Sequence, residues 1–381
     1  SIPVAFTDLI SLMAKIAYII YSLSNSAGME RSLTTRANFL SNIYDITIIT
    51  QVSGTDFFKL DPKIHRINLG IDTSLKKRDF KNECFRRLSD VLLSQKFDLV
   101  VSLGGMELFF LYKIRDGSKK VIEFRFSYDF HKIICSEKYP GFLGKIIGNI
   151  YTWRRNIYAR QYDYIVTLSR KDQLLWKRVM KNVAQIYNPL TISNQIKSNC
   201  RNKNVIAVGR LEFAKGFDIL IKSWKQLATK YPDWTLTIFG EGSKRDELQK
   251  LIETFGLAKS IFLKGRTANI VKEYANSSIF VLSSREEGFG LVITEAESCG
   301  LPIITFDCPN GPGEIVEDGF NGFVIGDVGN VDKLSNAICS LIENEELRCS
   351  MGEASLISVQ KFSEDIIRPQ WVKLFNEILK N

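Results

Sequence analysis

The segment EEGFGLVITE, residues 286–295, places two carboxylates, Glu287 and Glu295, on either side of a run that is mostly glycine and apolar residues. It follows an apolar run of strand character, IFVLSS, and continues into a helical pattern. The turn Gly288–Gly290 is therefore expected at the amino terminus of a helix, where free N–H groups and the positive end of the helix dipole attract phosphate without a metal ion. Both carboxylates can then reach one cleft and accept hydrogen bonds from sugar hydroxyls.

The acid pair is also compatible with a helix start that binds no ligand, where the two carboxylates would merely decorate the surface. A glycoside hydrolase is a further alternative, because a pair of carboxylates flanks the bond that such an enzyme breaks. Hydrolysis is the weaker alternative, because Glu287 and Glu295 belong to a turn that is suited to binding phosphate.

Around this segment, short apolar runs of strand character alternate with helical periodicity. In the first half, strands are expected at 15–20, 45–50, 97–103, 120–124 and 164–169, with helices that include 27–42 and 79–95. In the second half, strands are expected at 204–209, 234–240, 261–265, 279–284 and 302–307, with helices at 216–230, 244–256, 269–276 and 291–299. This is the βαβ rhythm of mostly parallel sheets with helices on both faces.

Length and composition indicate two domains. The chain has 381 residues, of which 45% are hydrophobic and 24% charged, as in an ordinary globular protein that is too long for a single core. Apolar residues thin out over 188–204, as in an interdomain linker, and we place the boundary near 190–203. The expected domains are 1–190 and 203–360, followed by a segment, 361–381, that carries a final amphipathic helix.

Several classes of protein are disfavoured. The seven cysteines are scattered, with no C-x-x-C spacing, so neither a disulfide framework nor a zinc site is supported and a reducing cytosol is expected. No apolar run approaches the roughly 18 to 20 residues that a membrane-spanning helix needs. Residues 1–12 lack the basic region and the cleavage site of a secretory leader, and we expect them to be an extension before a natural start at Met13.

The positive charge lies in the first half. Residues 1–190 contain 29 Lys and Arg against 17 Asp and Glu, whereas the whole chain has a net charge of only +9. Within residues 138–162 there are five Lys and Arg and no acid, and apolar residues recur at three- and four-residue spacings. This pattern is typical of a basic amphipathic helix on an anionic leaflet, and a core helix with a solvated basic face is the alternative. Nucleic acid would also account for the charge, but no recognised nucleic-acid-binding module accompanies it.

Three further loops follow expected strands, and ligands of open α/β sheets bind beyond the carboxyl ends of the strands. In VGRLEFAKG, Arg210 and Lys215 suit a pair of phosphates, although a solvated surface would use them equally well. In FGEGSKRDEL, Gly240 lets the backbone approach a ligand. The third loop, LKGRT at 263–267, offers backbone groups to the edge of a base.

Taken together, these residues resemble the family 4 glycosyltransferases, which are retaining enzymes of the GT-B architecture. The resemblance covers most of the chain and is strongest over 204–326. The E-x7-E signature of that family is present as Glu287 and Glu295, followed by AESCGLPIITFDCPNGPGEIVEDGFNGFVI, which looks like the family's nucleotide-sugar domain. The resemblance implies an α/β fold of two Rossmann-like, doubly wound domains that face a central cleft, with the last helix packing back on the first, acceptor-binding domain.

The resemblance also implies roles for individual residues. Arg210 and Lys215 would hold the donor diphosphate, Glu295 the ribose hydroxyls and Glu287 the transferred sugar. Catalysis is then expected to depend on Arg210, Lys215 and Glu287, with no metal ion and no cofactor. The complete expected donor site consists of Gly28, Arg210, Lys215, Gly240, Gly265, Arg266, Glu287, Gly288, Phe289, Gly290, Leu291 and Glu295.

The first domain matches the family less closely. The family's glycine-rich loop corresponds to SNSAGMERS, residues 24–32, in which Ala27 stands where a second glycine is common and Gly28 is retained. Many members have a histidine after the strand that here reads VIEFRFSYDFH, but this chain has Arg125 at about that place. The group that touches the sugar 6-hydroxyl or the acceptor therefore stays open between Arg125 and His131.

The implied reaction is the transfer of a hexose or N-acetylhexosamine from a UDP-sugar to a hydroxyl of a lipid-linked or polysaccharide acceptor, with retention, in bacterial surface glycan synthesis such as that of O-antigen or capsule. Two alternatives from other classes are a catalytically silent scaffold subunit of a membrane glycan-assembly complex and a nucleotide-sugar epimerase. The intact acids and cations disfavour the first, and the absence of an epimerase motif disfavours the second. The expected location is cytoplasmic, on the inner face of the membrane through residues 138–162.

Overall fold

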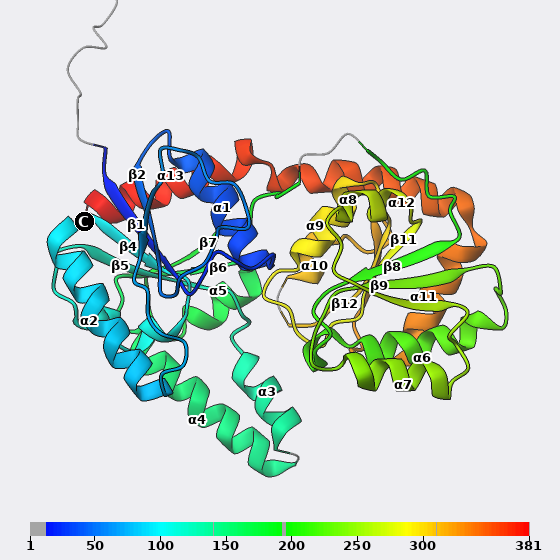
Figure 1. Ribbon diagram of the computed structural model, residues 1–381. Coiled ribbons are helices and arrows are strands. Elements are labelled where there is room, and N and C mark those ends of the chain that lie inside the picture. The colour runs from blue at the N-terminus through cyan, green and yellow to red at the C-terminus, as the bar shows by residue number, and fades with distance from the viewer. Residues whose placement is uncertain (1–12, 140, 193–195, 310, 381) are drawn as a thin grey trace, which may run out of the picture.

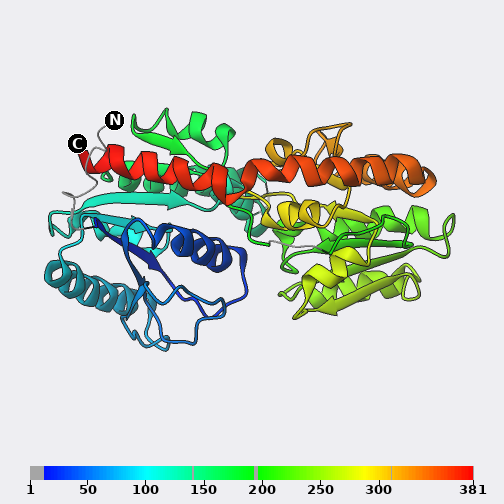
Figure 2. The same cartoon turned by 90° about the horizontal axis from the view of Figure 1, so that it is seen from above.

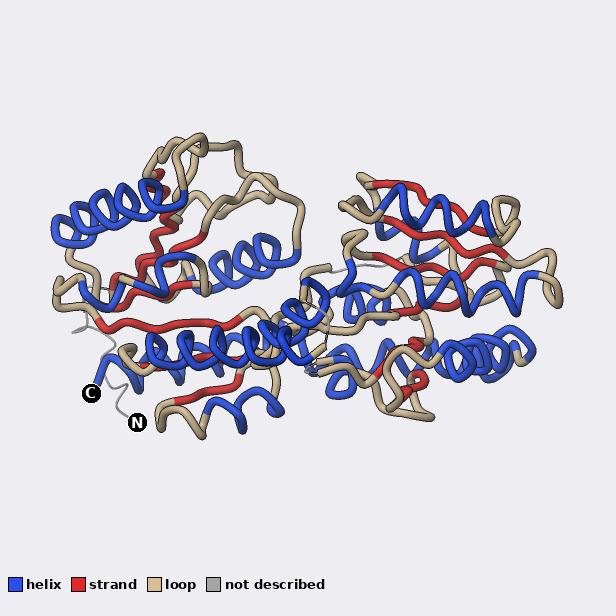
Figure 3. The backbone as a smooth tube through the Cα atoms, turned by 90° about the horizontal axis from the view of Figure 1, so that it is seen from below, coloured by secondary structure: helices blue, strands red, loops and turns tan. Residues whose placement is uncertain are grey.

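The computed structural model describes residues 13–139, 141–192, 196–309 and 311–380, so the expectation for residues 1–12 lies outside the described range. The described chain forms two lobes side by side, each built on one parallel sheet (Figure 1). Helices lie on both faces of each sheet (Figure 3). This arrangement agrees with two doubly wound, Rossmann-like domains.

The first lobe contains a seven-stranded sheet of order β3-β2-β1-β4-β5-β6-β7. Its strands are β1 (Lys15–Ile20), β2 (Asp45–Thr50), β3 (His65–Asn68), β4 (Leu99–Ser102), β5 (Lys119–Phe124), β6 (Tyr164–Thr167) and β7 (Val183–Gln185). Its helices are α1 (Gly28–Leu40), α2 (Lys77–Gln95), α3 (Phe130–Lys138), α4 (Phe142–Ala159) and α5 (Arg170–Trp176). The strand order reverses between β1 and β4, which is where ligands of such sheets usually bind.

The second lobe contains a six-stranded sheet of order β10-β9-β8-β11-β12-β13. Its strands are β8 (Asn204–Val208), β9 (Thr235–Phe239), β10 (Ile261–Gly265), β11 (Ile279–Leu282), β12 (Ile303–Phe306) and β13 (Gly322–Ile325). Its helices are α6 (Phe217–Ala228), α7 (Arg245–Thr254), α8 (Ile270–Ala275), α9 (Leu291–Ser298), α10 (Pro312–Ile315), α11 (Val331–Glu343) and α12 (Glu345–Ser358). Its strand order reverses between β8 and β11.

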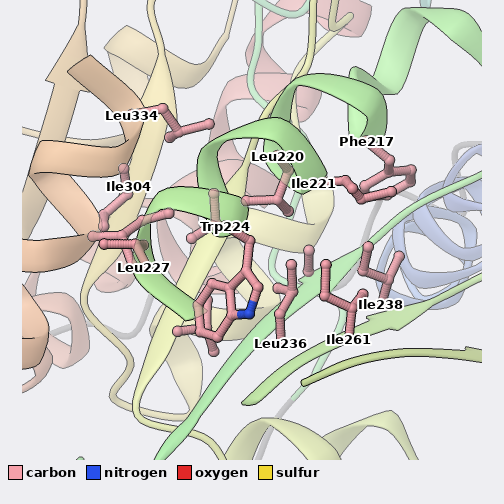
Figure 4. Close-up of a cluster of buried hydrophobic side chains, with 14 of the residues drawn as sticks. Phe217, Leu220, Ile221, Trp224, Leu227, Leu236, Ile238, Ile261, Ile304 and Leu334 are labelled. Carbon is pink, nitrogen blue, oxygen red and sulfur yellow. The ribbon is translucent and has the colours of Figure 1, made fainter. Parts of the chain in front are cut away.

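One apolar core of the second lobe lies between its sheet and α6 (Figure 4). The amphipathic helix buries one face against β9 and β10, and Trp224 is fully buried at its centre. The side chains labelled there are Phe217, Leu220, Ile221, Trp224, Leu227, Leu236, Ile238, Ile261, Ile304 and Leu334. This packing holds the loops after β8 to β11 at one edge of the sheet.

The last helix, α13 (Glu364–Lys380), returns to the first lobe and lies along it (Figure 2). The buried side chains of α13 belong to the same apolar cluster as residues of β1, β2 and β4. These side chains of α13 are Ile367, Trp371, Leu374, Phe375 and Ile378. The guanidinium of Arg36, on α1, lies 4.2 Å from the ring centroid of Trp371. The core of the first lobe is therefore completed by the end of the chain.

Most of the segment 138–162 forms one helix, as its pattern predicted. Helix α3 ends at Lys138, and α4 spans Phe142–Ala159 and packs against α3 in a hairpin that protrudes from the first lobe (Figure 1). A Cβ atom added to Gly144 would overlap the carbonyl oxygen of Tyr139, and one added to Gly148 would lie 2.7 Å from the Cα of Lys132. The two helices thus pack backbone to backbone through glycines.

Most bulky apolar residues of α4 face away from this glycine seam, whereas Tyr151 lies beside His131 of α3. Phe142 is 76% exposed and Trp153 is 66% exposed, and the other exposed apolar side chains of the helix are Leu143, Ile146, Ile150, Tyr151 and Ile157. The alternative of a core helix with a solvated basic face is therefore wrong for this segment. None of the helices in the described part of the chain is long and apolar enough to span a membrane.

Candidate functional site

The turn Gly288–Gly290 lies at the start of α9, at the face where the lobes meet. Gly290 has a φ of +99°, a conformation that favours glycine. A Cβ atom on Gly288 would overlap the carbonyl oxygen of Arg125 in the first lobe. The ring of Phe289 is buried, 5.8 Å from Tyr187 and 5.4 Å from Phe362 between centroids. The amino terminus of α9 is therefore fixed against the first lobe.

Gly28 is the first residue of α1 and lies in the first lobe, across the interface from the glycine turn. The position of a Cβ atom on Gly28 would be 3.0 Å from Cδ1 of Leu291, the first residue of α9. Two helix amino termini, one from each lobe, therefore lie close together. Because the amino terminus of a helix carries N–H groups without an intrahelical partner and the positive end of the helix dipole, this region suits an anion.

Glu287 and Lys215 form an ion pair within the second lobe. Lys215 Nζ is 2.6 Å from Glu287 Oε1, and the hydroxyl of Ser284 donates a hydrogen bond of 2.7 Å to the same oxygen. Glu287 is buried, and Lys215 ends a 3-10 turn, Phe213–Lys215, that follows β8. The following Gly216 has a φ of +63°, and a Cβ atom there would overlap the carbonyl oxygen of Ser283 after β11. Close packing of the two loops thus brings together a cation and an acid that are 72 residues apart.

Arg210 is exposed and forms no ion pair with any residue that the structure describes. Gly240 packs directly against the loop that contains Arg210, because a Cβ atom on Gly240 would overlap the carbonyl oxygen of Gly209. Gly265 has a φ of +72°, and Arg266 beside it is exposed. Glycine is therefore required at 240 by contact between two loops, while Arg210 and Arg266 keep their guanidinium groups accessible.

Glu295 is buried on α9 and receives hydrogen bonds from three separate segments. Arg31 Nη1, from α1 of the first lobe, lies 2.5 Å from Oε1, and the Thr191 hydroxyl donates to the same oxygen at 3.3 Å. The Tyr274 hydroxyl donates to Oε2 at 3.3 Å from α8. Burial raises the pKa of Glu295, and Arg31 opposes this effect.

Glu286 also joins the two lobes. Its Oε1 accepts a hydrogen bond of 3.2 Å from the backbone N–H of Ser127, in the segment that links β5 to α3. Burial and the neighbouring Glu287 raise the pKa of Glu286. The glycine turn is therefore held to the first lobe on both of its sides, at Glu286 and at Gly288.

Arg125 and His131 have different surroundings. Arg125 is buried, 2.9 Å from Glu123 Oε1, and it donates to Asn188 Oδ1 at 2.6 Å; burial lowers its pKa to about 10. His131 lies in the α3–α4 hairpin, where its ring centroid is 6.0 Å from that of Tyr151 and burial lowers its pKa. Arg125 is thus committed to a buried network next to the site, whereas His131 packs within the hairpin.

Comparison with known proteins identifies the family. A model of the glycosyl transferases of group 1 matches residues 190–356. An uncharacterized glycosyltransferase of Haemophilus influenzae is 30% identical over 366 residues, which cover 94% of this chain and 99% of the relative. The chain belongs to the group 1 glycosyltransferases.

Other relatives and structures agree with this assignment. The glycosyltransferase is 25% identical to the amylovoran biosynthesis glycosyltransferase AmsD of Erwinia amylovora, covering 96% of this chain and 100% of AmsD. Its fold matches TarM of Staphylococcus aureus with a TM-score of 0.79 at 18% identity, covering 96% of this chain and 100% of TarM. It matches Anabaena HepE, solved with UDP and glucose, with a TM-score of 0.77 at 20% identity, covering 96% and 99%. The glycosyltransferase therefore has the GT-B fold, as the sequence predicted.

Sequence reasoning missed several residues of the site of this glycosyltransferase. Arg31, Thr191 and Tyr274 surround Glu295, and Ser284 and Glu286 flank Glu287. Arg31 belongs to the quoted loop SNSAGMERS, but nothing in its spacing indicates a contact 264 residues away. Among the described residues, no group of three His, Cys, Asp or Glu side chains is placed to hold a metal ion.

Proposed function

We propose that this glycosyltransferase moves a hexose or N-acetylhexosamine from a UDP-sugar to a hydroxyl of a lipid-linked or polysaccharide acceptor, with retention at the anomeric carbon and without a metal ion. The observation that carries the proposal is the grouping of Glu287, Lys215 and Glu295 around the start of α9, between the two lobes. Carboxylates suit sugar and ribose hydroxyls, and the helix start and the lysine suit a diphosphate.

Catalysis in this proposal rests on the departing diphosphate. Negative charge develops on the phosphate oxygens as the bond to the sugar breaks, and preorganised positive groups stabilise it. Arg210, Lys215 and the amino terminus of α9 supply this stabilisation. Glu287 holds the sugar, and its pairing with Lys215 links the sugar position to the phosphate position.

The names of relatives support an acceptor in bacterial surface glycan synthesis. AmsD carries a name from amylovoran biosynthesis, and a Campylobacter jejuni relative, 25% identical over 96% of this chain and 99% of its own length, is named as an N-acetylgalactosaminyltransferase acting on an undecaprenol-linked glycan. HepE and TarM were solved with UDP bound. These names favour a UDP-sugar and a glycan carried on a lipid or polymer.

The first test is saturation-transfer NMR of the protein against UDP-, GDP- and ADP-sugars, with Glu295→Ala beside the wild type. Binding of one UDP-sugar that the variant loses supports the donor site and names the sugar for acceptor screens. If no nucleotide-sugar gives a binding signal, the result favours a catalytically inactive scaffold. Interconversion of a free donor without any acceptor favours an epimerase.

Retention and metal independence need their own measurements. Once an acceptor is found, proton NMR of the first product shows whether the new glycosidic bond keeps the configuration of the donor. Turnover that is unchanged by EDTA agrees with metal-free stabilisation of the diphosphate by Arg210 and Lys215. Turnover that EDTA abolishes and Mg²⁺ restores contradicts the proposal that no metal ion is needed.

We also propose that the α3–α4 hairpin binds the anionic inner face of the membrane. A hairpin in water normally buries its bulky apolar residues between the helices, but here glycines fill the seam and the apolar residues point outward. Lys138, Lys145 and Arg154 are exposed beside them. An apolar face with a basic margin suits an anionic lipid surface, where polyprenyl-linked acceptors are presented.

Flotation with vesicles that contain anionic lipid tests this surface. Wild-type protein should float at low salt, and the double variant Phe142→Ser/Trp153→Ser should stay in the dense fraction. Leu93→Ser, on α2, removes a side chain that is 54% exposed outside the hairpin and serves as the control. Failure of the wild type to bind at any salt concentration rules the proposal out.

A further inference from the structure

The ion pair between Arg31 and Glu295 joins the two lobes beside the proposed donor site. Arg31 lies in the first turn of α1, and Glu295 lies in α9. Their side chains are 22% and 7% exposed, and Nη1 is 2.5 Å from Oε1. The guanidinium also lies 5.0 Å from the ring centroid of Phe58, which limits the directions it can take. Arg31 is therefore held in one orientation toward the carboxylate.

The carboxylate of Glu295 keeps room for a ligand hydroxyl. An ionised carboxylate offers about four acceptor positions, and Arg31, Thr191 and Tyr274 use three of them. Two of these three hydrogen bonds are long, at 3.3 Å. The short bond from Arg31 is thus the contact that fixes where the carboxylate points, and at least one acceptor position is left.

A cavity of about 360 Å³ opens next to these residues. Residues of both lobes line it, among them Arg31, Phe58, Thr191 and Asn269. Its size is within the range of small-molecule sites, about 300–1,000 Å³. A ligand that entered the cavity would therefore meet Arg31 and Thr191, two of the three partners of Glu295.

We infer that Arg31 is a positioning residue for the donor: it reaches across from the first lobe and orients the Glu295 carboxylate toward the ribose. This inference rests on the proposed function, because it takes Glu295 as the ribose-binding acid. It adds a charged side chain of the first lobe to a donor site whose other proposed charged side chains belong to the second lobe.

The charge balance supports this role. Among the residues that the structure describes, Arg31 is the only ion-pair partner of Glu295. The other group that titrates beside it, Tyr274, is fully buried, and burial raises its pKa well above the ordinary value, so it stays a neutral donor. Burial raises the pKa of Glu295 and Arg31 lowers it, so loss of Arg31 leaves a buried carboxylate that protonates at a higher pH.

The test is calorimetric titration of UDP, from pH 5.5 to 8.5, into wild type, Arg31→Gln, Arg31→Lys and Arg78→Gln. Arg78 is the control, because it is an exposed arginine of α2 that does not line this cavity and forms no ion pair within the described residues. Arg31→Gln should weaken UDP binding about 10- to 100-fold, which is the range for losing one hydrogen bond to a charged group. As the pH is lowered, the UDP affinity of Arg31→Gln should begin to fall at a higher pH than that of the wild type.

Arg31→Lys should recover part of the affinity and most of the wild-type pH profile, because it restores the charge but not the planar fork. A purely structural role for Arg31 would lower stability without moving the pH profile. The inference is overturned if the wild type binds UDP and Arg31→Gln matches Arg78→Gln in both affinity and pH profile. If the wild type itself binds no UDP at any pH, the proposed function fails and the inference fails with it.

Discussion

Glu287 and Glu295 have the same chemistry, but different neighbours stabilise them. Glu287 is paired with Lys215 of its own lobe, so its ion pair lies within the second lobe. Glu295 is paired with Arg31 of the first lobe, so its ion pair exists only where the two lobes meet. At the scale of the residue, the candidate site therefore combines one acid that is paired within a lobe with one acid that is paired across the lobes.

Replacing Lys215 with alanine should reduce turnover at least about 10²-fold, by analogy with the removal of one preorganised donor from an oxyanion site. The lysine is expected to meet the departing diphosphate, and its loss also leaves the buried Glu287 without its cation. UDP-release assays at saturating donor measure the effect. Lys222→Ala removes an exposed lysine of α6 and should leave the rate unchanged. A wild-type rate in Lys215→Ala would remove this residue from the catalytic assignment.

Asp172 predicts a pH dependence of stability. Burial raises the pKa of this carboxyl from 3.8 to about 7, even though it accepts a 2.9 Å hydrogen bond from the Tyr128 N–H. The folded protein thus holds this proton up to a higher pH than the unfolded chain does. Its contribution to stability is fully present below about pH 4 and is lost as the pH rises through about 7.

In Asp172→Asn, the amide oxygen can still accept from Tyr128, but no proton is released. Thermal melting between pH 5 and pH 8 should therefore show the variant gaining stability relative to the wild type as the pH rises. Asp365→Asn changes an exposed acid of α13 and should follow the wild type. Parallel curves for Asp172→Asn and the wild type would contradict the raised pKa.

Most strands and many helices were predictable from the sequence, and the strands that were missed have a common cause. The strands that sequence analysis did not include are β3, β7 and β13, which have three or four residues and lie at sheet edges. Such short segments show neither the alternation nor the continuous apolar run that identifies a strand. The helix expected within 138–162 is present as α4, whereas the preceding helix, α3, was not predicted.

The candidate site was predictable to a similar extent. Glu287, Glu295 and the glycine turn follow from one local motif that decides its own secondary structure. Arg31 and Thr191 reach Glu295 from 264 and 104 residues away, and these contacts exist only because of the way the two lobes pack. No local pattern in the sequence predicts such contacts between the lobes.

Helix α13 should carry a large share of the stability of the first lobe. Trp371 is 1% exposed and packs against the guanidinium of Arg36. Trp371→Ala should lower the free energy of unfolding by about 3–5 kcal/mol, measured by chemical denaturation. Ile366→Ala, on the same helix at a side chain that is 49% exposed, should have little effect. Equal effects of the two changes would show that the helix does not complete that core.

At the scale of the whole molecule, several polar contacts tie the lobes together. Glu314 of the second lobe accepts from the backbone N–H groups of Arg170 and Lys171, which start α5, at 2.9 and 3.0 Å. Lys171 Nζ is 2.7 Å from Asp307 Oδ1, and the Tyr187 hydroxyl donates to Glu314 at 2.9 Å. The lobes are therefore joined by polar contacts in addition to those at the glycine turn.

Gly288→Ala should disturb this arrangement. The added methyl group would overlap the Arg125 carbonyl oxygen, so either the lobes separate or the turn shifts. Overpacking of this kind costs about 1–3 kcal/mol, and we expect weaker UDP binding together with a larger radius of gyration in small-angle X-ray scattering. Gly326→Ala is the control, because a Cβ atom there meets nothing within 4 Å. Unchanged scattering and UDP affinity in Gly288→Ala would show that this close approach does not control closure.

The return of α13 to the first lobe also bears on how the protein is made. Chains are synthesised from the amino terminus, and domains usually fold in that order. Here the lobe that emerges first stays open along one face until the final 17-residue helix has been translated. A premature stop or a proteolytic cut just before residue 364 would therefore damage the lobe that is farthest from it in sequence, and the two halves of this enzyme are poorly suited to separate expression.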